Sequence, residues 1–481
     1  MRPYSLFRLV VGWSMLVGSQ SSERTRAIHL ARNKDHGKAQ KRAANVGPPK
    51  RDATVRSLNT LPSSTEAAAR LRRKACASKP LRSLATFEAA AGKLKDRAVS
   101  RRQTVGPVMR RRAAQLGLCW NATSGLDPMS SSSAYRGLVD KHFDLYTDAM
   151  RFKFAVAFLH ASKAGGTSFC ALSYENDCRD PIFGNGTSGS SWRWNCWSRT
   201  HGDGPVWTTL PSKWAPGSRK DPRNGWWAVS EPSAFRSPRA SSCLALEQEV
   251  LKRETTFLMN ENWLPPEGLC QRFMNVALFR DPLRRFISHR NYLKVLRSPL
   301  PVQVSDFVRL APVISNNYYV RVLAGESAFF SGLGNVTGLH LAAALDQLGA
   351  LDLVLTLEAL DTHGPVLIRR GLGWERNKVL GLNRRSKSRD ADLPLDAKGE
   401  ALWRAHNALD LQLYERAAEL AELDYEFFRQ VHISAEASAG AWPDEHFWKM
   451  SPSSAEDPGV DCKHTCGYAC HLRVGPAEET W

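Results

Sequence analysis

Three apolar runs in the middle of the chain have the pattern of buried β-strands. They cover residues 152–160, 273–279 and 351–358, and the first two are almost continuously apolar, as expected for strands covered on both faces. Segments with helical spacing follow the first two runs, and a further helix is predicted over 399–420. Strands that alternate with helices predict an α/β domain with a mainly parallel sheet flanked by helices. The ligand of such a sheet binds at the carboxyl ends of its strands.

A long insertion, residues 185–245, separates the first two of these runs. Seven of the 15 tryptophans fall within 192–227, among Gly, Pro, Ser and Arg. A loop of this length is usually functional or disordered, and this many tryptophans argue against disorder. Two interpretations remain open, a lid that packs on itself and a rim whose aromatic faces stack on an acceptor.

Residues 1–22 have the charge pattern of a segment that directs a chain into the secretory route. Arg2 and Arg8 precede a mainly apolar run over 9–18, which is short for a membrane span. We expect a signal anchor or a cleaved signal peptide, and a transit peptide is the competing interpretation because an Arg-rich region follows. Three sequons favour the secretory route: Asn121, Asn185 and Asn335.

The net charge of +19 is concentrated near the amino terminus. Residues 20–118 contain 24 of the 66 basic residues and only 6 of the 47 acidic ones, so the rest of the chain is nearly neutral. We therefore predict a disordered, basic, low-complexity stem over 23–143, with a short helix around 65–77. The stem is interpreted as a solvated tether or as a polycation that grips an acidic polymer. No nucleic-acid recognition motif accompanies it.

The ten cysteines are spread through the chain, and several lie in a carboxyl-terminal tail, residues 434–481. Cys462, Cys466 and Cys470 are spaced four apart with histidines nearby, which is not a standard zinc-ligand spacing. Disulfides are the expected state in a secretory lumen, and a zinc site is the alternative.

The sequence "HASKAGGTS", residues 160–168, combines features of an anion-binding loop. It joins the first predicted strand to a helix, so backbone N–H groups and a helix amino terminus face the ligand. Lysine precedes the glycines, whereas it follows them in the common nucleotide-binding loop, and the cradle is sized for one phosphate. We see no downstream acidic residue at a strand end to hold Mg²⁺. The candidate contacts are Lys163, Ala164, Gly165, Gly166, Thr167 and Ser168.

A second candidate anion site follows the strand predicted over 273–279. Arg280 ends this strand, and Asp281 with Pro282 is the start signal of a helix. Ser288 then lies about two helical turns along. A guanidinium and a hydroxyl are a good phosphate grip, so Arg280 and Ser288 are candidates to hold a second phosphate.

These two sites carry a resemblance to a known enzyme family. "FLHASKAGGTS" resembles the 5′-phosphosulfate loop of Golgi-type carbohydrate sulfotransferases, including the heparan-sulfate and galactose sulfotransferases, and "VALFRDPLRRFISHRNYL" resembles their 3′-phosphate motif. "NNYYVRVLAG", "LVLTLEALD", "LGW" and "LNRRSK" follow in the family order, so the resemblance covers about 150–430. The chain departs from the family pattern at Ala161, Ser162 and Ala164.

The resemblance implies a P-loop-NTPase-like fold that binds 3′-phosphoadenosine 5′-phosphosulfate (PAPS) and transfers its sulfuryl group without a metal. Lys163 would stabilise the leaving phosphate oxygen. Glu261 occupies the place of the family's general base, with Glu254 and His201 as rivals. Arg384 is a candidate to close over the nucleotide, and a solvated charged loop is an equal alternative.

The sequence as a whole predicts a type II Golgi membrane protein with a lumenal catalytic domain, which would be secreted if the amino-terminal segment is cleaved. Its expected parts are the 1–22 segment, the 23–143 stem, a sulfotransferase domain over 144–433 and the 434–481 tail. The expected partner is a glycan acceptor, with no specific nucleic acid. The alternatives are a nucleotide kinase or NTPase, a basic nucleic-acid- or polyanion-binding protein, and a catalytically inactive sulfotransferase-like module. The sequence leaves the acceptor sugar and the oligomeric state open.

Overall fold

The structure is a computed structural model of the whole chain. It describes residues 83–100, 106–176, 178, 242–252, 255–260, 263–296, 304–305, 308, 312–375, 395–438 and 462–472. All of these belong to one compact unit, Leu61–Trp481. The predicted signal or anchor segment, almost all of the Trp-rich insertion and the helix expected around 65–77 lie outside the described residues.

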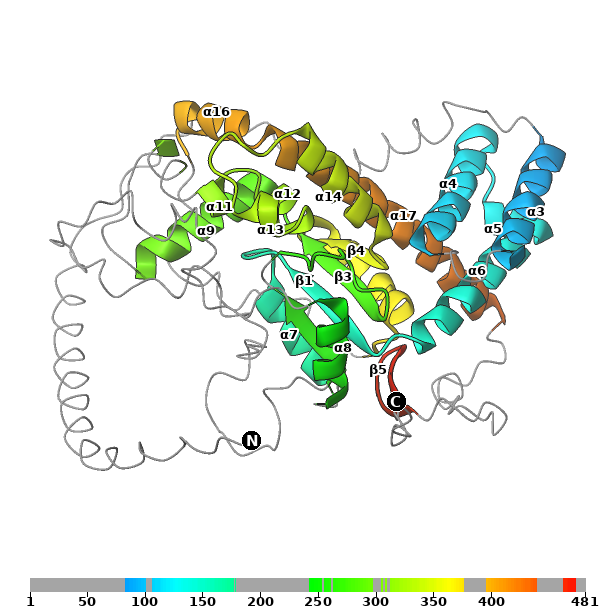
Figure 1. Cartoon of the computed structure of the whole chain (residues 1–481). Helices are drawn as coiled ribbons and strands as arrows, with labels where there is room; N and C mark the ends of the chain where they lie inside the picture. Colours follow the sequence, from blue (N-terminus) through cyan, green and yellow to red (C-terminus); the bar gives the residue numbers. More distant parts are fainter. Residues whose placement is uncertain are drawn as a thin grey trace, which may run out of the picture. The chain divides into compact units, whose positions relative to one another are not determined.

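The centre of the unit is a four-stranded sheet in the order β2-β1-β3-β4 (Figure 1), and every neighbouring pair is parallel. The strands are β1 (Ala155–His160), β2 (Phe257–Asn260), β3 (Phe273–Phe279) and β4 (Leu353–Thr356), and nearly all their residues are buried. The α/β class and the parallel sheet are therefore confirmed.

The sequence pattern missed β2, because a run of three apolar residues, Phe257 to Met259, followed by Asn260 is too short to stand out.

Helices flank this sheet, and those between β1 and β2 in the chain lie across it from those between β3 and β4 (Figure 1). The first group is α7 (Gly166–Glu175) and α8 (Cys243–Lys252). The second begins with α9 (Pro282–Leu296), where the Arg284 N–H donates to Asp281 Oδ1 at 2.7 Å, so the predicted start signal is confirmed. The others that follow β3 are α11 (Pro312–Ser315), α12 (Tyr318–Leu323), α13 (Glu326–Phe329), α14 (Gly338–Ala350), η6 (Leu357–Ala359), α15 (Leu360–Val366), η7 (Leu367–Leu372), α16 (Ala397–His406) and α17 (Ala408–Ser438).

The single helix predicted over 399–420 is divided at Asn407 into α16 and α17. The Asn407 amide donates to the carbonyl oxygens of Trp403 and Ser315 at 2.9 and 2.8 Å, and its Oδ1 accepts from the Asn317 N–H at 2.8 Å. This side chain replaces the interrupted helical hydrogen bonds and ties the break to the start of α12.

The prediction of a disordered stem over 23–143 is wrong for the second half of this segment, which is folded. Its helices are α3 (Leu84–Ser100), α4 (Pro107–Ser124), α5 (Pro128–Ser131) and the first part of α6 (Ser133–Arg151). They enclose a buried aromatic cluster in which the ring of Phe87 lies 4.8 Å from Trp120 and 5.1 Å from Tyr135. The expected boundary at 143/144 therefore falls inside α6.

Two arginines of this segment are buried ion-pair partners, not solvated charges. Asp424 of α17 accepts from Arg110 Nη2 at 2.9 Å and from Arg111 Nε and Nη2 at 2.9 and 2.8 Å. Both arginines also donate to backbone carbonyl oxygens just before β4: Arg110 to that of Asp352, and Arg111 to those of Gly349 and Leu351. The basic segment is thereby joined to both the sheet and the last long helix.

The tail contributes a β-hairpin, β5 (Cys462–Cys466) and β6 (Ala469–Leu472). Its turn uses Gly467 at φ +64°, where a side chain would also collide with the Leu372 carbonyl. The Tyr468 N–H donates to that carbonyl at 3.1 Å, and a disulfide joins Cys466 to Cys178 beyond α7. Because Cys466 is in a disulfide, it is not a zinc ligand, and the alternative of a zinc site that includes Cys466 is wrong. The described residues contain no group of three or more His, Cys, Asp or Glu able to hold a metal ion.

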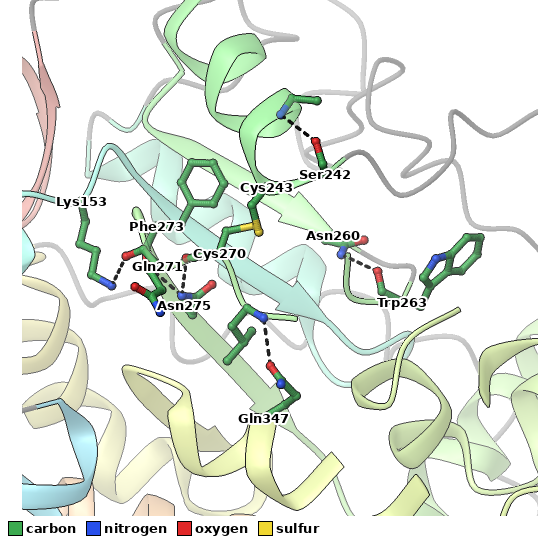
Figure 2. Close-up of a disulfide and its surroundings, with 12 residues drawn as sticks. Lys153, Ser242, Cys243, Asn260, Trp263, Cys270, Gln271, Phe273, Asn275 and Gln347 are labelled. Carbon is green, nitrogen blue, oxygen red and sulfur yellow. Dashed lines mark hydrogen bonds between the residues drawn. A yellow bond between two sulfur atoms is a disulfide. The ribbon is translucent and has the colours of Figure 1, made fainter. Parts of the chain in front are cut away.

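A second disulfide, Cys243–Cys270, ties α8 to the turn before β3 (Figure 2). Two hydrogen bonds hold the same turn: the Asn275 side-chain amide donates to the Cys270 carbonyl at 3.0 Å, and the Leu269 N–H donates to Gln347 Oε1 at 2.9 Å. Cys119 and Cys170 are also disulfide-bonded. No helix among the described residues is long and apolar enough to cross a membrane.

Candidate anion site at the strand ends

The predicted anion loop and Arg280 follow adjacent strands and meet at one edge of the sheet. β1 ends at His160, which lies opposite Leu278 in the parallel register, so the loop after β1 and the residue after β3 leave the sheet side by side. The guanidinium Nη1 of Arg280 donates to the Lys163 carbonyl at 3.2 Å. The structure therefore brings together the two features that the sequence separates by 117 residues.

The loop between β1 and α7 is a compact turn. The Ala164 N–H donates to the Ala161 carbonyl at 3.0 Å, and the Ser168 N–H donates to the Gly165 carbonyl at 3.0 Å. Lys163 and Gly165 both have positive φ, +68° and +100°. The value at Gly165 is typical of glycine, but the value at Lys163 is uncommon for a residue with a side chain. The hydrogen bond from Arg280 to the Lys163 carbonyl stabilises this backbone conformation.

Glycine at the next position is dictated by His160. A Cβ on Gly166 would lie 1.9 Å from Cδ2 and Nε2 of the His160 ring, so the ring rests directly on the first residue of α7. Burial and the nearby Lys163 cation lower the pKa of His160 to about 3, which keeps the ring neutral near pH 7.

The other predicted contacts lie at the same end of the sheet. Ala164 is buried beneath the loop, Ser168 is half-buried in the first turn of α7, and Ser288 is half-buried on α9. Thr167 belongs to the first turn of α7, where its backbone is described. The remaining predicted site residues lie outside the described residues: His201, Glu254, Glu261 and Arg384.

Two adjacent tyrosines of α12, which were not among the predicted site residues, reach these loops. Tyr318 Oη accepts from the Ser162 N–H at 3.1 Å. Tyr319 Oη accepts from the Arg280 N–H at 3.0 Å and donates to the Arg280 carbonyl at 2.7 Å. Their signal in the sequence is the pair of aromatic hydroxyls in "NNYYVRVLAG", far along the chain from both loops.

Two carboxylates also follow the strands, although the sequence singled out no acidic residue at a strand end to hold Mg²⁺. Asp281 follows β3 and caps α9, and Glu358 follows β4. Glu358 Oε1 accepts from the Asp281 N–H at 3.0 Å and Oε2 from the Tyr414 hydroxyl at 2.7 Å. Burial raises the pKa of Asp281, and the neighbouring Glu358 adds to this effect. These carboxylates hold the Arg280 turn in place through protein donors.

Further cationic character comes from α9. Arg285 is buried, donates to the Ile314 carbonyl at 2.6 Å and stacks its guanidinium 4.2 Å from the centre of the Tyr318 ring. Burial, Arg285 and Lys163 together hold the pKa of His289 well below its ordinary value. Lys163, Arg280 and Arg285 thus bring three cationic side chains to the loop region, and its histidines are neutral. Cations at a strand-to-helix loop are typical of an anion-binding site, while Asp281 and Glu358 at the neighbouring strand ends offset part of this charge.

The third motif, "NNYYVRVLAG", also contains a structural residue. Arg321 is fully buried and donates to the backbone carbonyls of Asn316, Ala328 and Phe329. It therefore holds the α12–α13 turn and is not available to a ligand.

Comparison of the chain with protein-family models, with curated proteins and with solved structures gives no significant match.

Proposed function

We propose that this protein is a sulfotransferase with a P-loop-like fold, which transfers the sulfuryl group of PAPS to a hydroxyl of a glycan. The observation that carries the proposal is the contact between Arg280 and the backbone of Lys163. It supports two anion-binding elements at neighbouring strand ends, as a donor with separate 5′-phosphosulfate and 3′-phosphate groups requires.

The proposed roles follow from chemistry and position. Lys163 stabilises the negative charge that develops on the leaving phosphate oxygen. Backbone N–H groups at the start of α7, with Thr167 and Ser168, hold the 5′-phosphate, while Arg280 and Ser288 hold the 3′-phosphate. Transfer breaks the bond between sulfur and the bridging phosphate oxygen and forms one to the acceptor oxygen.

A general base must take the acceptor proton. Glu261 directly follows Asn260, the last residue of β2, and β2 pairs with β1 in parallel. This position in the chain supports Glu261 as the base, with Glu254 and His201 as alternatives. Glu261→Gln should then abolish transfer and leave donor binding intact.

The cysteines support the proposed Golgi lumen. Six described cysteines are in disulfides, and such bonds form and persist in oxidising compartments. The sequon residue Asn335 is exposed in the loop before α14, where an oligosaccharide can be accommodated. The segment expected to anchor the chain, 1–22, lies outside the described residues.

The test is incubation with PAPS carrying labelled sulfate and a panel of glycans. We expect label on at least one glycan, and Lys163→Ala should lower the rate by about 10²–10³-fold. Lys93→Ala, which changes an exposed lysine on α3, is the matched control and should leave the rate unchanged. Mg²⁺-dependent hydrolysis of a nucleoside triphosphate without sulfate transfer would favour the kinase or NTPase alternative. Tight binding of adenosine 3′,5′-bisphosphate without sulfated product would indicate an inactive module.

A further inference from the structure

We propose that Tyr318 and Tyr319 are positioning residues that fix the spacing of the two anion-binding loops, one tyrosine for each loop. This inference rests on the proposed function and extends it from the groups that contact the donor to the device that sets their separation. The two residues are consecutive on α12, so the distance between their hydroxyls is set by one rigid turn of helix.

The Tyr318 hydroxyl acts on the loop after β1. It accepts from the Ser162 N–H at 3.1 Å, in the residue immediately before Lys163. Ser162 is fully buried, so its N–H would lose its hydrogen bond to water on folding, and the hydroxyl supplies a replacement. The backbone that carries Lys163 into its unusual positive φ is thereby held from one side by Tyr318 and from the other by Arg280.

The Tyr319 hydroxyl acts on the turn after β3. It accepts from the N–H of Arg280 and donates to the carbonyl of the same residue, at 3.0 and 2.7 Å. Two hydrogen bonds to one residue fix both the position of its backbone and the direction in which its side chain leaves. The ring of Tyr319 also packs edge-on against Phe279, the last residue of β3, with centroids 5.2 Å apart.

The tyrosines are themselves immobilised. Both side chains are at least 98% buried, as their exposed fractions are 2% and 1%. The carboxylate of Asp410, at the start of α17, accepts from the N–H groups of Tyr319 and Val320 at 3.1 and 3.0 Å, and the Arg285 guanidinium covers the Tyr318 ring. The hydroxyls are therefore presented from a fixed support.

A fixed separation matters because the proposed donor carries its two phosphate-containing groups at opposite ends of a nucleoside. A ligand that bridges two loops binds more tightly when the loops are held at the bound spacing in advance, since less ordering is required on binding. Removal of one hydroxyl should loosen one loop and leave the other in place.

The experiment compares Tyr318→Phe and Tyr319→Phe with the wild-type chain in equilibrium binding of 5′-AMP, 3′-AMP and adenosine 3′,5′-bisphosphate. Each variant keeps the buried ring and loses only the hydroxyl. We expect Tyr318→Phe to weaken the binding of 5′-AMP about 3–10-fold and to leave the binding of 3′-AMP nearly unchanged, and we expect the reverse for Tyr319→Phe. This range corresponds to the loss of one buried hydrogen bond. Both variants should bind adenosine 3′,5′-bisphosphate more weakly than the wild-type chain does.

Tyr146→Phe is the matched control, because its buried hydroxyl donates to the carbonyl of Gly371, in η7 and not in either loop. It should lower thermal stability as the other two variants do, without selectivity between the monophosphates. The proposal is overturned if Tyr318→Phe and Tyr319→Phe weaken both monophosphates equally, or leave both unchanged. If the wild-type chain binds none of the three nucleotides, the proposed function fails and the proposal fails with it; nucleotide binding without selectivity contradicts the positioning role alone.

Discussion

The buried pairing of Arg110 and Arg111 with Asp424 predicts a large loss of stability in Asp424→Asn. The Asp424 side chain is fully buried, and its two oxygens accept three hydrogen bonds from the arginines and a fourth, at 3.1 Å, from the Val354 N–H of β4. The variant keeps the shape of the side chain but leaves two buried guanidinium groups without their counter-charge.

Removal of one partner from a buried ion pair typically costs about 3–5 kcal/mol. We expect a loss of that size, measured as the shift of the urea midpoint multiplied by the slope of the transition, with unfolding followed by far-UV circular dichroism. The control is Glu400→Gln, which breaks a half-exposed pair with Arg404 at 2.7 Å on α16 and should cost at most about 1 kcal/mol.

The same pair has a pH signature. Burial alone would raise the pKa of Asp424, but Arg111 and Arg110 outweigh it and hold the pKa below its ordinary value. The stabilisation is therefore complete above the unfolded pKa of about 3.9 and is lost as the pH falls through the lower, folded value. If Asp424→Asn costs no more than the control, the helices of 84–151 do not depend on this pair, and the reasoning is refuted.

Three further predictions concern the loop, the histidines and the tail. Gly166→Ala should abolish nucleotide binding because its Cβ collides with the His160 ring, and His160→Ala in the same chain should restore part of it, measured by calorimetry. Burial lowers the pKa of His142 and His160 to about 4 and 3, so below pH 6.5 the unfolded chain binds more protons than the folded chain does. The melting temperature should therefore fall as the pH is lowered from 6.5 toward 4, and His142→Gln should make this fall smaller. The double variant Cys178→Ser, Cys466→Ser should increase amide hydrogen exchange at the end of α7, which the tail hairpin holds.

Each of these has a control and a contradicting outcome. Gly349→Ala on α14, where a Cβ meets nothing within 4 Å, should leave binding unchanged; a failure of His160→Ala to rescue Gly166→Ala would contradict the steric account. A melting temperature that is flat between pH 7 and 5 would contradict the neutral buried histidines. Cys243→Ser with Cys270→Ser should increase exchange at α8 instead, and equal effects of the two disulfide pairs on α7 would exclude a specific role for the hairpin.

The sequence was informative where structure is local. Continuous apolar runs predicted β1 and β3, and the rule that ligands bind at strand ends correctly brought Lys163 and Arg280 together. β4 was placed within two residues at each end, since an alternating run does not define where pairing with the neighbouring strand begins and ends.

The sequence was misleading where partners are distant. Arg110 and Arg111 look like solvated charges in an Ala- and Arg-rich segment. The carboxylate that pairs with them in the folded chain, that of Asp424, lies more than 300 residues later. Likewise, the hydroxyls of Tyr318 and Tyr319 reach loops that only the folded sheet brings to them. No local pattern contains such pairings.

The central claim, that two loops at adjacent strand ends hold one nucleotide by two separate phosphates, is tested most directly by calorimetry. The wild-type chain and Arg280→Ala are titrated with adenosine 3′,5′-bisphosphate, 5′-AMP and ATP with Mg²⁺. We predict that the bisphosphate binds the wild-type chain most tightly and that Arg280→Ala removes its advantage over 5′-AMP. Tighter binding of ATP with Mg²⁺, or an unchanged advantage in Arg280→Ala, would contradict the claim.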